Sequence, residues 1–124
     1  MTDPKTVSTA ALAYLGDAVL ELFVRSLLVD RGVSSSKALN AKALEFVRAP
    51  VQAKAMERIL PLLGEEEIAV FHRGRNLGHT NTPKNATVAE YRNATGMEAL
   101  FGFLHLTGNA ERAAELFALA YPEA

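Results

Sequence analysis

Apolar residues recur along this chain at spacings of three and four, and this helical period constrains the fold more than any other feature. No stretch alternates apolar and polar residues between hairpin turns, as a half-buried strand would. The chain has 124 residues, 49% of them hydrophobic, which suffices for one core. We therefore expect an all-α fold, a single helical-bundle domain over residues 1–124. The six expected helices cover residues 9–31, 34–49, 50–60, 64–76, 87–106 and 109–121.

Local signals support these helix ends. Ser8 or Thr9 can cap the first helix, and Gly32 offers a left-handed stop after it. Pro50 suits the first turn of the third helix. Residues 76–87 are rich in Gly, Asn, Thr and Pro, so they predict the longest loop.

Composition excludes several classes of protein. The chain has no cysteine, which excludes disulfides, thiolate nucleophiles and cysteine-based zinc sites and fits a reducing cytoplasm. The apolar run over residues 10–29 contains Asp17, Glu21 and Arg25, so we expect neither a signal peptide nor a membrane-spanning helix. The net charge is −1, but residues 34–92 hold nine Lys/Arg against six Glu. A basic middle of this kind also arises on ordinary solvated surfaces.

Two carboxylates stand in unexpected places. Gly16 and Asp17 interrupt an otherwise strong helix, although each is unfavourable in a helix interior. Glu98 lies among apolar residues, with Gly96 and Gly102 on the same predicted helix. The residues alone leave open whether these features mark close helix packing or a ligand. Because each acid lies in an apolar helix that contains glycine, we expect the two helices to pack together and the two acids to form a hard oxygen site suited to Mg²⁺ or Mn²⁺.

Other chemistry has weaker support. Glu21 and Arg25 fit an ordinary exposed pair, and His105 fits a packed or capping histidine better than a catalyst. The segment HRGRNLGHTNTPKN, residues 72–85, has basic and amide side chains without an acid, a composition that suits phosphate and ribose contacts. A nucleotide pyrophosphohydrolase would need glutamates spaced along one helix, whereas residues 65–67 are consecutive at a helix start.

The acid-bearing segments resemble a known family. YLGDAVLE and ATGMEALFG resemble the two acidic signatures of ribonuclease III endonuclease domains. With HRGRN and PKN between them, the chain is most similar to the Mini-III ribonucleases, a short bacterial branch without a separate double-stranded-RNA-binding domain. This resemblance covers residues from about 10 to 119.

The resemblance implies a homodimeric, cytoplasmic endoribonuclease that cleaves double-stranded RNA with Mg²⁺, for which Mn²⁺ can substitute. It assigns catalysis and metal binding to Asp17 and Glu98. It further implies maturation of the precursor of large-subunit (23S) ribosomal RNA, with possible help from a ribosomal protein. RNA binding falls on Arg73, Arg75, Asn76, His79, Lys84 and Asn85.

The chain also departs from the larger ribonuclease III enzymes. Ala13 and Thr95 stand where those enzymes carry two further acids, which leaves open the number of metal ions per site. The alternative function is a structured-RNA-binding module with the same fold and no catalysis.

Overall fold

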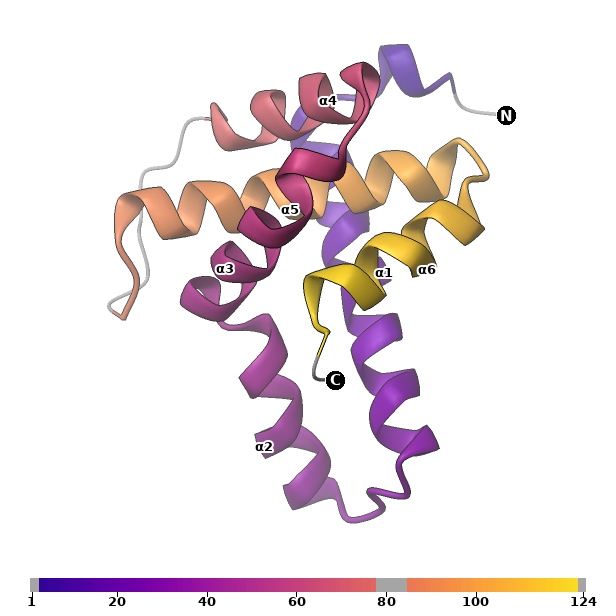
Figure 1. Cartoon of the computed structure of the whole chain (residues 1–124), viewed down its shortest axis with the longest axis vertical. Coiled ribbons are helices and arrows are strands. Elements are labelled where there is room, and N and C mark those ends of the chain that lie inside the picture. The colour runs from indigo at the N-terminus through magenta and orange to yellow at the C-terminus, as the bar shows by residue number, and fades with distance from the viewer. Residues whose placement is uncertain (1–2, 78–84, 123–124) are drawn as a thin grey trace.

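The computed structural model describes residues 3–77 and 85–122, and these contain six α-helices and no strand (Figure 1). The predicted all-α fold is therefore confirmed. Two short 3₁₀ turns, η1 (Pro4–Thr6) and η2 (Leu60–Leu62), precede α1 and α4. The helices are α1 (Thr9–Asp30), α2 (Ser36–Val47), α3 (Ala49–Ile59), α4 (Glu65–Arg75), α5 (Val88–Leu106) and α6 (Ala110–Ala120).

Side-chain caps and left-handed glycines fix the helix ends. The Ser8 hydroxyl accepts a hydrogen bond from the Ala11 amide at 3.0 Å, which decides between the two expected caps of α1. Beyond the ends of α1 and α5, Gly32 and Gly108 adopt φ values of 82° and 75°. Ser8 thus caps the start of α1, and Gly32 follows its end in the left-handed conformation, as the sequence predicts.

Helix α5 is the centre of the molecule. It contacts α1, α3, α4 and α6, and Figure 1 shows it crossing the other helices. Ten of its residues are buried, all between Ala94 and Leu104. Other helices surround α5, and its sequence is accordingly apolar on most sides. A half-buried acid, Glu98, in the middle of such a helix is exceptional.

Helices α1 and α5 cross in backbone contact. A Cβ atom built on Gly16 would lie 1.5 Å from the carbonyl oxygen of Glu98, and one on Gly102 would lie 2.0 Å from that of Leu12. No side chain fits at either position. The two glycines that weaken these helices locally therefore permit the crossing.

A second close contact joins α4 to α5. A Cβ on Gly74 would lie 2.7 Å from the Cβ of Ala99, and one on Gly96 would lie 2.6 Å from the Phe71 ring. This contact fixes the end of α4 against α5. The end of α4 that carries Arg73 and Arg75 therefore lies against α5, the helix that carries Glu98.

Several large apolar side chains of α1 are exposed. Tyr14, Leu22 and Val29 are 85%, 68% and 66% exposed. Among the described residues, no helix combines the length and apolar character needed to cross a membrane.

Substitution of Gly16 tests the crossing. We expect Gly16→Ala to lower the free energy of unfolding by about 3 kcal/mol or more, because its methyl group would meet the Glu98 backbone. Chemical denaturation measures this change. Gly64→Ala is the matched control, since the nearest atom to its added Cβ is a side-chain oxygen at 3.8 Å. Equal, small effects of both substitutions would contradict the packing argument.

Candidate active site

The α1–α5 crossing brings Asp17 and Glu98 together. Gly16 lies against the backbone of Glu98, so the side chain that follows Gly16 emerges beside the Glu98 side chain. The two carboxyls are close enough to hydrogen-bond. Asp17 is exposed, whereas Glu98 is half-buried. The pair thus consists of a partly buried carboxyl on α5 and an exposed carboxyl on α1.

The environment of Glu98 favours its protonated form. Burial is the largest cause, followed by the negative charge of Asp17 and the hydrogen bond between the two carboxyls, and together they raise the pKa of Glu98 from 4.5 to about 8. At neutral pH the protein therefore keeps a proton in the pair. A perturbed carboxyl at an accessible site is typical of functional centres.

This donor set fits a divalent cation. Carboxylate oxygens are the ligands that Mg²⁺ prefers, and Mg²⁺ needs only one or two of them because it keeps several waters. A cation between the carboxyls would also relieve the repulsion that raises the Glu98 pKa. The described residues contain no cluster of three or more His, Asp or Glu able to hold a metal ion. Within that part of the chain, the protein offers two carboxylates.

Ala13 and Thr95, which by the resemblance stand where the larger enzymes carry acids, are both buried. The Thr95 hydroxyl donates a hydrogen bond to the Tyr91 carbonyl oxygen at 3.0 Å, one turn earlier on α5. The Thr95 hydroxyl therefore donates its proton within α5 and not to the carboxyl pair.

The residues predicted to bind RNA have different positions. Arg73 is exposed, and its guanidinium lies 3.5 Å from the Val7 carbonyl oxygen. Arg75 is half-buried and donates to the Asn93 amide oxygen at 3.1 Å, so it joins α4 to α5. Asn76 and Asn85 are exposed at the end of α4 and shortly before α5. The other two predicted residues, His79 and Lys84, lie outside the described residues.

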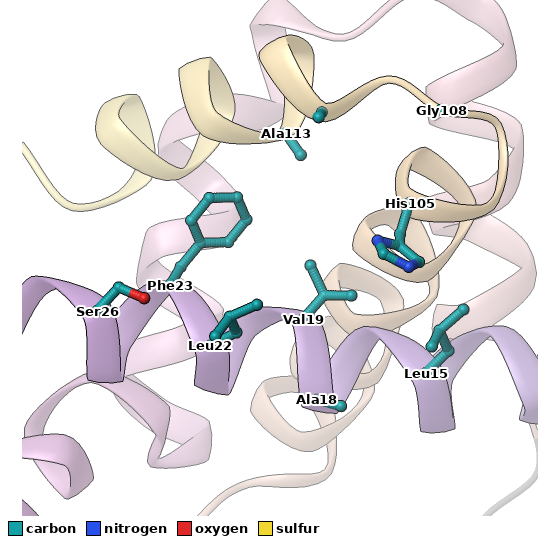
Figure 2. Close-up of a pocket in the computed structure, with 10 residues that line it drawn as sticks. Leu15, Ala18, Val19, Leu22, Phe23, Ser26, His105, Gly108 and Ala113 are labelled. Atoms are coloured by element: carbon teal, nitrogen blue, oxygen red, sulfur yellow. The ribbon is translucent and has the colours of Figure 1, made fainter.

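Sequence reasoning did not locate an apolar groove that lies along α1. Its volume is about 750 Å³. Figure 2 shows α1 on one side and the α5–α6 corner on the other, and His105 lies exposed at this corner. The lining of this α1 groove includes Leu15, Val19, Leu22, Phe23, His105 and Ala113. The groove joins residues distant in sequence, which periodicity alone could not pair.

Comparison with known proteins decides the family. A family model described as the ribonuclease III domain matches residues 10–109. The chain belongs to the ribonuclease III domain family. Within it, the chain belongs to the Mini-ribonuclease 3 group, as its curated relatives bear that name. The predicted resemblance is confirmed.

Three similarities illustrate this relationship. The Mini-ribonuclease 3 of Symbiobacterium thermophilum is 43% identical over 97% of this chain and 92% of its own length. That of Desulfitobacterium hafniense is 48% identical over 86% of this chain and 67% of its length. The crystal structure of a Fusobacterium nucleatum protein matches with a TM-score of 0.87 at 28% identity, covering 99% of this chain and 98% of that one.

The carboxyl pair should make stability depend on pH. Unfolded Glu98 releases its proton near pH 4.5, whereas folded Glu98 keeps it until about pH 8. Between these values we expect the free energy of unfolding of metal-free protein to fall as pH rises, by about 5 kcal/mol in total. Denaturation at several pH values, with a chelator present, measures this change. Glu98→Gln should remove that component, and parallel pH profiles for the parent and the variant would contradict the assignment.

Proposed function

We propose that this ribonuclease III-type endoribonuclease cleaves double-stranded RNA and requires a divalent metal ion, Mg²⁺ or Mn²⁺. One observation carries the proposal. Asp17 and Glu98 lie side by side across a backbone crossing that only glycine permits, in a chain that matches the ribonuclease III domain. A binding module without catalysis would have no use for a carboxyl pair held at the cost of mutual repulsion.

The two carboxyls have distinct proposed roles. Asp17 and Glu98 would hold the metal ion, which would supply Lewis acidity for activating water and offsetting charge on the phosphate. Glu98 would be the direct ligand, in its deprotonated form, and the buried residues around it on α5 would hold its side chain in place. Asp17 is exposed, so it faces the side from which RNA approaches and serves as a ligand or orients water.

RNA binding would use the exposed side chains beside this site. Arg73 and Asn76, at the end of α4, and Asn85, before α5, offer a guanidinium and amides for phosphate and ribose oxygens. Arg75 would act mainly by holding α4 against α5, through its bond to Asn93. By resemblance, we also assign RNA binding to His79 and Lys84.

The α1 groove supports a homodimer. An apolar groove of about 750 Å³ beside a 68% exposed leucine is costly to leave in water. The α1 surfaces of two copies can cover one another around a two-fold axis, which also provides two carboxyl pairs for the two strands of a duplex. By family resemblance, the physiological substrate is the precursor of 23S ribosomal RNA in the cytoplasm, with a ribosomal protein as a possible helper.

Cleavage of a long RNA duplex with Mg²⁺ tests the proposed reaction. We expect Glu98→Gln and Asp17→Asn each to slow cleavage about 100-fold or more, because each removes a carboxylate from the pair. Gel-resolved initial rates provide the measurement. Glu21→Gln is the matched control: it lies one turn after Asp17, forms a 3.0 Å ion pair with Arg25, and should stay within about two-fold of the parent. Binding of the duplex by the parent without cleavage would favour the binding module instead.

The two arginines at the end of α4 should differ in effect. In the Glu98→Gln background, Arg73→Ala should weaken duplex binding and reduce the slope of log affinity against log salt by about 1. Arg75→Ala should in addition lower the free energy of unfolding by about 1 kcal/mol, because it removes the bond to Asn93. Binding isotherms at several salt concentrations and denaturation curves separate these effects. An unchanged salt slope in Arg73→Ala would exclude a phosphate contact.

A charge on α1 should separate the dimer. We expect Leu22→Glu to convert a dimeric parent into a folded monomer at micromolar concentration, because the carboxylate would be buried in the interface. Light scattering gives the mass and circular dichroism the helix content. Leu44→Glu, at a 55% exposed leucine on α2 outside the α1 groove, should remain dimeric. A monomeric parent, or a Leu22→Glu dimer, would contradict this interface.

A further inference from the structure

A second pocket lies at the far end of α1 from the carboxyl pair. Its volume is about 470 Å³, and its lining comes from the end of α1, from α2 and α3, and from the residues after α6. Arg31, at this end, is about 20 Å along the helix from Asp17 at the usual rise per residue. The pocket is therefore separate from the proposed active site. In Figure 1 the end of α6 lies between α1 and the pair formed by α2 and α3.

Three basic side chains, each from a different helix or helix end, line this pocket. Arg31 caps the end of α1, Lys42 lies on α2 and Arg58 lies on α3. Glu45 is the single acid in the lining. None of these four residues forms an ion pair with another described residue. The pocket consequently has an excess of positive charge that the described protein does not neutralise.

Hydrogen bonds hold the pocket in shape. The Arg58 guanidinium donates to the Ala120 carbonyl oxygen at 2.8 Å, which fixes this cation at the end of α6. The Tyr121 hydroxyl donates to the Phe46 carbonyl oxygen, also at 2.8 Å. The rings of Phe46 and Tyr121 lie 5.4 Å apart, centroid to centroid. A charged group and an aromatic wall are thus positioned before any ligand arrives.

This combination matches one class of ligand. A guanidinium and an ammonium group bind phosphate oxygens, and aromatic rings stack on nucleobases. The volume lies within the range of small-molecule sites in proteins. We propose that this pocket binds a nucleoside phosphate, with the phosphate at Arg31, Lys42 and Arg58 and the base against Phe46 and Tyr121. Two sources share that chemistry: a free nucleotide, and a terminal nucleotide of an unpaired RNA strand.

Calorimetric titration of ADP into the Glu98→Gln protein tests the pocket without any need for cleavage. We expect one ADP per chain, bound at least 10-fold more tightly than inorganic phosphate because the base adds stacking. Lys42→Glu should weaken ADP binding 10-fold or more, and Phe46→Leu several-fold. Lys37→Glu, an exposed lysine on the same helix but outside the pocket, should bind ADP like the parent.

A second titration distinguishes the two sources. A blunt RNA duplex and the same duplex with a single-stranded end are compared in the Glu98→Gln and Glu98→Gln/Lys42→Glu proteins. Tighter binding of the single-stranded end, lost with Lys42→Glu, identifies the terminal nucleotide as the ligand. ADP binding without any preference for that end identifies the free nucleotide.

Two results would overturn the proposal. The first is an absence of ADP binding together with equal affinity for the two duplexes. The second is ADP binding that Lys42→Glu and Lys37→Glu weaken equally, or that is no tighter than binding of phosphate. The proposed nuclease is tested independently, because Lys42→Glu should cleave a blunt duplex at the parental rate.

Discussion

The backbone contact between α1 and α5 is the constraint on which the rest of the structure depends. Gly16 and Gly102 each leave no room for a Cβ, so the helices approach until main-chain atoms touch. That approach buries the middle of α5 and brings the side chains that flank the contact, Asp17 and Glu98, to one place. Packing and the candidate site thus have the same physical origin, and a change that separates the helices should affect both.

The crossing also determines the electrostatics of the site. Glu98 lies in the buried centre of the bundle beside another acid, so its pKa rises to about 8. Without a bound cation, this carboxyl pair lowers the stability of the fold near neutral pH. Natural proteins usually keep a destabilising arrangement of this kind where it serves a function. In the proposed enzyme, a divalent cation bound by both carboxylates would relieve this repulsion. The exposed Asp17 leaves the pair open toward solvent.

Much of this fold follows from local sequence signals, since the helix periods, Ser8 and Gly32 act at short range and behave as predicted. The two adjacent penalties at Gly16 and Asp17 indicated a close contact or a ligand, and the structure shows the close contact. Apart from the packing of the two acid-bearing helices, long-range pairings were not readable. The Arg75–Asn93 bond, the α1 groove and the pocket near Arg58 each join elements whose relative placement no local pattern encodes. Arg75 joins α4 to α5 through its bond to Asn93, and its contact with RNA stays a prediction.

The most direct test of the central claim is the number of protons released when Mn²⁺ binds the free protein at pH 7. Calorimetry in two buffers of different ionisation enthalpy provides it. If the crossing creates a protonated carboxyl pair that a metal ion occupies, close to one proton should leave per ion bound, because the pKa of Glu98 is about 8. Glu98→Gln should bind Mn²⁺ weakly and release none. Tight binding without proton release, or binding that Glu98→Gln leaves unchanged, would contradict the account.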